Sequence, residues 1–143
     1  MKGGVKFFRG NAAAARNYLE TDCSRSDDYY LREGSGLAER VEIVMRDYRD
    51  ERGSYDGIAS IEMFEAVGEK YWPAYFETVR GRLKPGAQAT IQVITVPDAL
   101  FPDYRRTVDF VQKYIFPGGM LPSPGALKAE IARAGLGLVG SVE

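Results

Sequence analysis

Short runs of β-branched and apolar residues alternate with amphipathic stretches along most of this chain, which is typical of a sheet covered by helices. From residue 41 onward the pattern predicts strands at Val41–Arg46, Tyr55–Met63 and Ala89–Val96. Between the last two strands, Lys70–Leu83 has the spacing of an amphipathic helix and ends before Pro85-Gly86. Strands that alternate with helices across short turns predict a parallel α/β sheet.

The signals before residue 36 are shorter. Val5–Phe8 predicts a strand, and Asn11 is a good N-cap for an alanine-rich helix over Ala12–Leu19. A polar stretch and the turn at Gly34–Gly36 separate these elements from the alternating part of the chain.

Two more helices and a strand are predicted toward the C-terminus. One helix ends at "FPGG" and presents a single apolar face made of Tyr104, Val108, Val111 and Ile115. Ser123 as N-cap and Pro124 at the first helical position begin the next helix, which Gly135 closes. Leu136–Val142 predicts a last strand.

In a parallel α/β sheet, ligands bind beyond the carboxyl ends of the strands. Three polar segments fall at such ends: "DYRD" (47–50), "EMFEAVG" (62–68) and "VITVPD" (93–98). From the residues alone, Glu62 and Glu65 read more readily as solvated acids at a helix entry than as site residues. Asp47 and Asp50 likewise read as caps of a strand-to-loop turn, and Trp72, Tyr75 and Phe76 as core.

Composition narrows the function classes. A chain of 143 residues with 45% hydrophobic and 27% charged residues fits one soluble domain. Its net charge of −1 argues against a domain that grips a nucleic-acid backbone. The chain has no histidine, which removes His-dependent metal sites and the commonest general base. A single cysteine excludes an intrachain disulfide and is comfortable in a reducing cytoplasm, and we expect a soluble, unexported protein.

Three longer motifs sharpen this picture: "SIEMFEAVG", "LKPGA" and "YIFPGGMLPS". Together with the sequence around them, from Gly36 to about Leu136, they closely resemble cyclopropane-fatty-acyl-phospholipid synthases. These are class I S-adenosylmethionine (SAM)-dependent methyltransferases that act on phospholipid acyl chains. The resemblance implies an incomplete Rossmann-like class I methyltransferase sheet with flanking helices, preceded by a short unrelated N-terminal segment.

The resemblance also implies a chemistry and its residues. The family transfers the SAM methyl group to a cis double bond, and bound bicarbonate takes the proton that leaves as the ring closes. The methylated chain is a carbocation until that proton leaves. An apolar site without competing nucleophiles suits this carbocation. Glu65 matches the glutamate that helps to hold bicarbonate, Ile94 matches a position that contributes backbone, and Gln92 stands where some members have histidine. The matched SAM-binding positions are Asp47, Tyr48 and Ile61, and no metal is implied.

Several family elements have no counterpart here. The glycine-rich SAM loop, the acid that binds the ribose and the catalytic cysteine would precede Gly36, and Cys23 lies in unmatched sequence. The tyrosine that completes the bicarbonate site would follow Glu143. We therefore expect a truncated chain that binds SAM weakly and is inactive alone.

The missing elements also affect the expected sheet. In the family's strand order, 3-2-1-4-5-7-6, Val41–Arg46 is the third strand and Tyr55–Met63 the fourth, and the two strands between them are missing. Because the first forty residues offer only Val5–Phe8 as a replacement, we expect a compacted partial sheet in which Val41–Arg46 packs loosely.

Residues 1–41 resemble a different family. The run "GGVKFFRGNAAAARNYLETDCSRSDDYYLREGSGLAERV" is similar to the start of actinobacterial conjugative relaxases. Relaxases bind a metal ion through histidines, and this chain has no histidine with which to form that site. The implied division is a relaxase-like segment at 1–40 and a methyltransferase domain at 41–143. The hexapeptide "GLAERV" (36–41) fits both families and is a natural join point.

Three interpretations stay open. The first is a methyltransferase acting on phospholipid acyl chains at the membrane surface, in the cytoplasm and peripheral to the inner membrane face, with no nucleic-acid partner. The second is a relaxase-related DNA-processing protein. The third is a non-functional chimeric reading frame, which sequencing of genomic DNA across residues 30–45 tests.

Overall fold

The computed structural model describes residues 4–8, 17–20, 42–107, 111–115 and 118–142. The chain divides into two compact units, and each is described by itself. The first unit comprises residues 1–63 and 81–92, and the second comprises residues 64–80 and 93–143.

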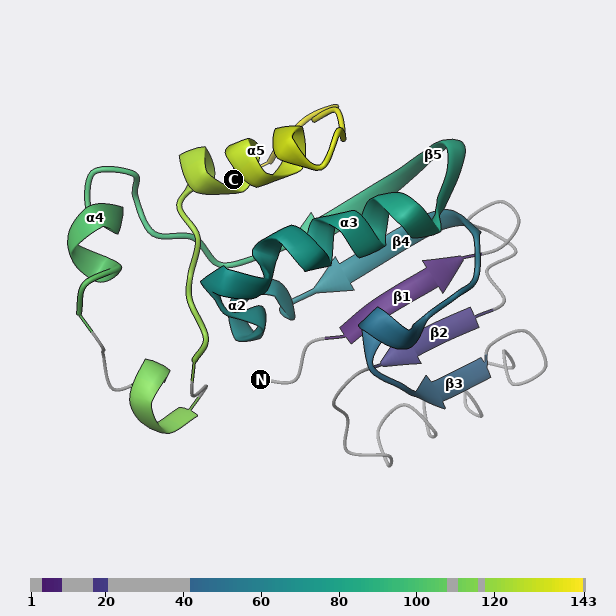
Figure 1. Ribbon diagram of the computed structural model, residues 1–143, viewed down its shortest axis with the longest axis horizontal. Coiled ribbons are helices and arrows are strands. Elements are labelled where there is room, and N and C mark those ends of the chain that lie inside the picture. Colours follow the sequence, from purple (N-terminus) through teal and green to yellow (C-terminus); the bar gives the residue numbers. More distant parts are fainter. Residues whose placement is uncertain (1–3, 9–16, 21–41, 108–110, 116–117, 143) are drawn as a thin grey trace. The chain divides into compact units, whose positions relative to one another are not determined.

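A three-stranded sheet forms the centre of the first unit (Figure 1). Its middle strand is β4 (Tyr55–Ile61), which lies between β1 (Gly4–Phe8) and β5 (Leu83–Gln92). β4 and β5 are parallel, as the alternating pattern predicted. Tyr55, Ile58 and Ser60 of β4 are buried. The strands predicted at Val5–Phe8 and Tyr55–Met63 are therefore confirmed.

β5 differs from the strand predicted at Ala89–Val96 at both ends. It begins at Leu83, directly after a helix, and the register with β4 shifts before the regular ladder starts at Gln88. Pro85 has no N–H to give to a ladder, and Gly86 has a φ of 78°, which a residue with a side chain rarely adopts. The Pro-Gly pair thus interrupts the ladder without ending the strand. At the other end the strand stops at Gln92, four residues earlier than predicted.

A two-stranded parallel sheet pairs β2 (Asn17–Glu20) with β3 (Glu42–Met45). β3 confirms the strand predicted at Val41–Arg46. β2 shows that a helix over Ala12–Leu19 is wrong for residues 17–19, while residues 12–16 lie outside the described residues. Pairing with β3 outweighs the helix preference predicted for residues 17–19, because propensity is a weak preference.

β1 is antiparallel to β4, with Gly4 opposite Ile61 and Phe8 opposite Gly57. β2 lies next to β1 on the side away from β4, and β1 points opposite to β2, β3 and β4 (Figure 1). The expectation that only one strand fills the place between the family's third and fourth strands is wrong, because β1 and β2 both lie there. Since β1 is reversed, its carboxyl end is at the edge of the sheet opposite to the carboxyl end of β4.

The second unit is mostly helical and has an aromatic core. α2 (Phe64–Val67) and η3 (Glu69–Tyr71) lead into α3 (Trp72–Arg82), which confirms the helix predicted over Lys70–Leu83. The ring of Phe64 lies 5.2 Å from Trp72, 4.9 Å from Tyr75 and 5.3 Å from Phe76, centroid to centroid. All four side chains are buried, so the three predicted core aromatics are confirmed and Phe64 joins them.

The predicted helix with Tyr104 and Ile115 on one face is interrupted. α4 (Phe101–Tyr104) ends in a turn, and a short π-helix, η4, spans Val111–Ile115. Residues 108–110 and 116–117 lie outside the described residues. The predictions that Val108 belongs to the apolar face and that the helix ends at "FPGG" therefore stay predictions.

The last helix begins and ends as predicted. α5 (Pro124–Arg133) is capped by Ser123, whose Oγ accepts a 3.2 Å hydrogen bond from the Ala126 amide, and Gly135 follows with a φ of 73°. The strand predicted at Leu136–Val142 is wrong: these described residues form no strand, and Val139 and Val142 are almost fully exposed. Within the described part of the chain, every helix is too short or too polar to span a lipid bilayer.

Candidate active site

The six candidate site residues fall into two groups, one in each unit. Glu65 and Ile94 belong to the second unit. The first unit holds Asp47, Tyr48, Ile61 and Gln92.

Glu65 is a buried acid that the described part of the chain holds through one of its two carboxylate oxygens. It lies in the first turn of α2, directly after Phe64 of the aromatic core, and 8% of its surface is exposed. Its Oε1 accepts a 2.6 Å hydrogen bond from the main-chain amide of Ile94. Its Oε2 is buried and has no hydrogen-bond partner in the described part of the chain. A buried carboxylate oxygen without a partner is costly, and a catalytic role or a bound water or ion is among the explanations for such an atom in a native structure.

Ile94 reaches Glu65 because the chain leaves the sheet just before it. After β5 ends at Gln92, the amides that would extend the ladder bond elsewhere: that of Ile94 to Glu65, and that of Val96 to the carbonyl of Pro122 at 3.0 Å. The Ile94 side chain is half exposed, so only its backbone takes part in this group.

Gln92 is the last ladder residue of β5, and its exposed side chain belongs to the first unit. Its carbonyl accepts a 3.1 Å hydrogen bond from the Glu62 amide. The structure therefore brings Glu65 and Ile94 together in the second unit, and a role for Gln92 at the same site stays a prediction.

Glu62 has an unusual backbone conformation where β4 ends. Its φ is 49°, in the left-handed region, where a residue with a side chain carries strain of about 1–2 kcal/mol. The hydrogen bond to Gln92 holds it there. Strained residues of this kind cluster at functional sites, and nothing in the sequence predicted this one.

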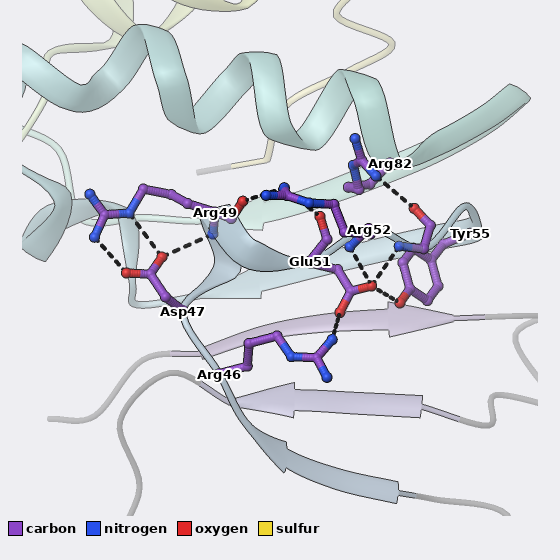
Figure 2. Close-up of polar contacts among 8 residues, drawn as sticks. Arg46, Asp47, Arg49, Glu51, Arg52, Tyr55 and Arg82 are labelled. Atoms are coloured by element: carbon purple, nitrogen blue, oxygen red, sulfur yellow. Dashed lines mark hydrogen bonds and ion pairs between the residues drawn. The ribbon is translucent and has the colours of Figure 1, made fainter.

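Asp47 ends the segment that follows β3, and its carboxylate caps a short 3-10 helix, η2 (Tyr48–Asp50). Oδ1 accepts hydrogen bonds of 2.9 Å from both the main-chain amide and Nε of Arg49, and Oδ2 accepts one of 2.5 Å from Arg49 Nη2. The Arg49 guanidinium is also the main reason that the pKa of Asp47 lies below its usual value. The turn-capping interpretation of Asp47 is thus what the geometry shows (Figure 2).

Tyr48 and Ile61 complete this group. Tyr48 is buried, and burial raises the pKa of its hydroxyl. Ile61 is half-buried at the end of β4, where it pairs with Gln92 of β5 and Gly4 of β1.

A further acid, Glu51, organises the loop between β3 and β4 and was missed in the sequence. It is 5% exposed and accepts four hydrogen bonds: from Arg46 Nη1 at 3.1 Å, the Arg52 amide at 2.9 Å, the Gly53 amide at 2.6 Å and the Tyr55 hydroxyl at 2.6 Å (Figure 2). Burial raises the pKa of Glu51, but these hydrogen bonds outweigh it, and the pKa lies below 4.5. A buried acid this well satisfied stabilises the loop rather than offering an open oxygen.

Comparison with known proteins identifies the family. The model of the mycolic acid cyclopropane synthetase family matches residues 26–142. The chain belongs to this family. The resemblance to cyclopropane-fatty-acyl-phospholipid synthases is therefore confirmed, whereas the relaxase-like interpretation of residues 1–41 stays a prediction.

Two relatives of this cyclopropane synthetase family member illustrate the match. Tuberculostearic acid methyltransferase UfaA1 of Mycobacterium tuberculosis (strain ATCC 25618 / H37Rv) is 47% identical over 93 residues, 65% of this chain and 22% of the relative. Cyclopropane-fatty-acyl-phospholipid synthase of Escherichia coli (strain K12) is 39% identical over 84 residues, 58% of this chain and 21% of the relative. The matched part of the chain thus spans less than a quarter of either relative.

The fold of the family member matches solved structures as well. Mycolic acid cyclopropane synthase CmaA1, complexed with SAH and CTAB, aligns with a TM-score of 0.65 and 19% identity over 87% of this chain and 47% of that chain. At this identity the likeness concerns the fold, and it confirms the predicted α/β methyltransferase class.

Proposed function

We propose that this chain takes part in SAM-dependent methyl transfer to the double bond of a phospholipid acyl chain, with Glu65 as the acid that holds a bicarbonate ion. The observation that carries the proposal is the buried Oε2 of Glu65, which has no partner among the described residues. The family membership and the methyltransferase and synthase relatives support the reaction class.

The second unit offers an acceptor for the O–H group of a bicarbonate ion. Glu65 Oε2 is an acceptor, so it can take a hydrogen bond from the hydroxyl of bicarbonate. The Ile94 amide already donates to Oε1, so Ile94 acts by orienting Glu65 rather than by binding the ion through its amide. Bicarbonate, when bound, supplies the base for the proton that leaves during ring closure.

The residues in the first unit fit the adenine of SAM only if an ion pair opens. Both oxygens of Asp47 bond to Arg49, whose side chain is 54% exposed. Exposed ion pairs contribute little, about 0–1 kcal/mol, so an amino group of a ligand can replace this one. Tyr48 and Ile61 would supply the apolar surface beside it. SAM, when bound, supplies the methyl group from its sulfonium.

We further propose that residues 1–143 alone bind SAM weakly and do not turn over. In the class I methyltransferase fold the glycine-rich SAM loop follows the strand next to the fourth one. Here that neighbour is β1, which is reversed, so its carboxyl end is on the opposite edge from the carboxyl end of β4. Calorimetry with SAM tests this, and low-micromolar binding would contradict it.

For the acyl-chain partner we propose the cytoplasmic surface of a membrane. Leu100 and Tyr114 in the second unit are 59% and 61% exposed, and the ammonium of Lys113 lies 5.1 Å from the Tyr114 ring. An exposed ring beside a cation, with a further exposed apolar side chain in the same unit, is suited to an anionic lipid surface. Sedimentation with phosphatidylglycerol vesicles, compared with phosphatidylcholine vesicles, tests this.

The bicarbonate site is tested by following ¹³C-bicarbonate NMR line widths on addition of the full chain. We expect broadening with the wild type and little with Glu65→Gln. The amide oxygen of the glutamine can still accept from the Ile94 amide, but its NH2 group then places a donor at the second position. Glu77→Gln, which changes an exposed acid on α3, is the matched control. Equal broadening in wild type and Glu65→Gln would refute a bicarbonate site at Glu65.

A further inference from the structure

Gly68 and Gly118 lie back to back in the second unit. Gly68 follows α2 with a φ of 76°, and a Cβ on it would lie 2.5 Å from the carbonyl oxygen of Gly118. Real Cβ atoms do not approach a main-chain oxygen so closely. Position 68 therefore excludes a side chain for two reasons, backbone conformation and contact with the Gly118 backbone.

The segment that begins at Gly118 forms hydrogen bonds with Glu65 itself and with the segment after β5 that carries Ile94. The amide of Met120 donates a 2.8 Å hydrogen bond to the Glu65 carbonyl, and the carbonyl of Pro122 accepts one of 3.0 Å from Val96. The Ile94 amide in turn bonds to the Glu65 carboxylate, so the hydrogen bonds and the main chain together close a ring. The ring runs from Glu65 to Met120, along the chain to Pro122, across to Val96, and along the chain to Ile94 and back to Glu65.

The same segment is anchored by burial. Pro122 is among the fully buried side chains, and the buried Gln112 places its Nε2 3.5 Å from the Met120 sulfur. A segment fixed at these points resists small displacements, because a packed interior has little free volume.

We propose that Gly118–Pro122 is a positioning clamp for the Glu65 carboxylate, and that Gly68 is a positioning residue because its missing side chain lets the clamp dock. The proposal rests on the proposed role of Glu65 and adds the element that orients it. Among the described residues the Glu65 carboxylate has one hydrogen bond, so the direction of its other oxygen depends on where α2 and Ile94 are held.

The test compares Gly68→Ala with two glycine controls by amide hydrogen exchange and NMR on the full chain. Gly135→Ala and Gly86→Ala carry similar left-handed strain, with φ of 73° and 78°, but the Cβ at position 135 would meet the flexible Arg80 side chain, at 3.3 Å, and the Cβ at position 86 would meet nothing within 4 Å. We expect Gly68→Ala to speed exchange at the Ile94 and Met120 amides by about tenfold or more, and the controls by less than about threefold. Equal acceleration by all three variants would overturn the clamp, because strain rather than docking would then explain it.

A spectroscopic readout separates positioning from general loosening. In the wild-type background, Glu65→Gln should move the Ile94 amide proton resonance, since a charge-assisted hydrogen bond becomes a neutral one. When Glu65→Gln is made in a Gly68→Ala chain, the Ile94 resonance should move much less, and the Ile58 amide resonance of β4 should stay unchanged. A full displacement in the Gly68→Ala background would refute the proposal.

A wild-type measurement covers the case in which Gly68→Ala does not fold. Native-state exchange at increasing urea should show the Ile94 and Met120 amides opening in one event, with the same denaturant dependence. Separate openings would overturn the clamp. None of these readouts uses bicarbonate, so a chain that fails to bind the ion but shows joint opening refutes only the proposed function.

Discussion

The main-chain amide of Ile94 lies 2.6 Å from Oε1 of Glu65, while the other oxygen of the same carboxylate is buried without a partner in the described part of the chain. This asymmetry distinguishes Glu65 from Glu51, a second buried acid, which receives four hydrogen bonds. Among the described residues, one acid is satisfied by the fold and the other keeps an unbonded oxygen. The contrast supports the proposal that Glu65 holds a ligand.

Replacing Glu65 by Gln should therefore stabilise the free chain. The change removes a buried charge with an unsatisfied oxygen and keeps an acceptor for the Ile94 amide, so we expect the free energy of unfolding to rise by about 1–2 kcal/mol. Urea denaturation followed by the fluorescence of the buried Trp72 measures it. Glu77→Gln on the exposed face of α3 should change stability by less than about 0.5 kcal/mol. A loss of stability in Glu65→Gln would show that the carboxylate is satisfied within the fold.

The sequence predicted the elements whose signals are local. The ladder of β4 and β5, the Ser123 cap with Pro124, and the aromatic face of α3 follow from β-branched runs, capping chemistry and helical spacing. The motif "SIEMFEAVG" also points to Glu65 through the family resemblance.

What the sequence did not predict depends on partners far along the chain. Asn17–Glu20 is a strand because β3 pairs with it, and Leu136–Val142 is not one because no described strand lies beside it. Ile94 leaves its predicted strand because its amide bonds to Glu65, 29 positions away in the sequence. The left-handed backbone at Glu62 has no local signal at all, since a glutamate rarely adopts it.

Glu51 should make the stability of the chain depend on pH in the acid range. Its folded pKa is lowered from 4.5, so its stabilisation is present above that value and is lost as pH falls through the folded pKa. At neutral pH we expect Glu51→Gln to lower the free energy of unfolding by about 1–3 kcal/mol, because one amide cannot accept four hydrogen bonds as well. Denaturation of both chains across this range should show the difference shrinking as pH falls below 4.5. A difference that is constant with pH would contradict the assignment.

Gly53→Ala should destabilise the same loop by steric contact. A Cβ at Gly53 would lie 2.3 Å from the Tyr55 hydroxyl oxygen, so the ring must move away from Glu51. We expect a loss of about 1–3 kcal/mol, the range for a buried group left without its hydrogen bond. Gly81→Ala on α3 meets nothing within 4 Å and should instead be neutral or stabilising by up to about 1 kcal/mol. Thermal denaturation of the two variants compares them directly, and a similar effect in both would argue against the contact.

Glu62→Gly should relieve backbone strain. A left-handed residue with a side chain costs about 1–2 kcal/mol, and glycine recovers this less the entropy of a freer unfolded chain, for a net gain of about 0.5–1 kcal/mol. Glu62→Ala, which keeps a Cβ at a φ of 49°, should show no such gain. If the alanine variant gained as much as the glycine variant, the carboxylate rather than the backbone would be the source of strain.

Hydrogen exchange should rank the strands of the first unit. β4 has paired strands on both sides, β1 and β5, whereas the one ladder of β3 within the described residues is with β2. Because amides with few long-range partners exchange through low-energy local openings, we expect the amides of Glu42–Met45 to exchange at least about tenfold faster than those of Tyr55–Ile61. Exchange followed residue by residue by NMR at one pH makes the comparison, after correction for intrinsic rates. Equal protection of β3 and β4 would show that all the strands of this unit open as one cooperative sheet, and it would contradict the loose packing expected for Val41–Arg46.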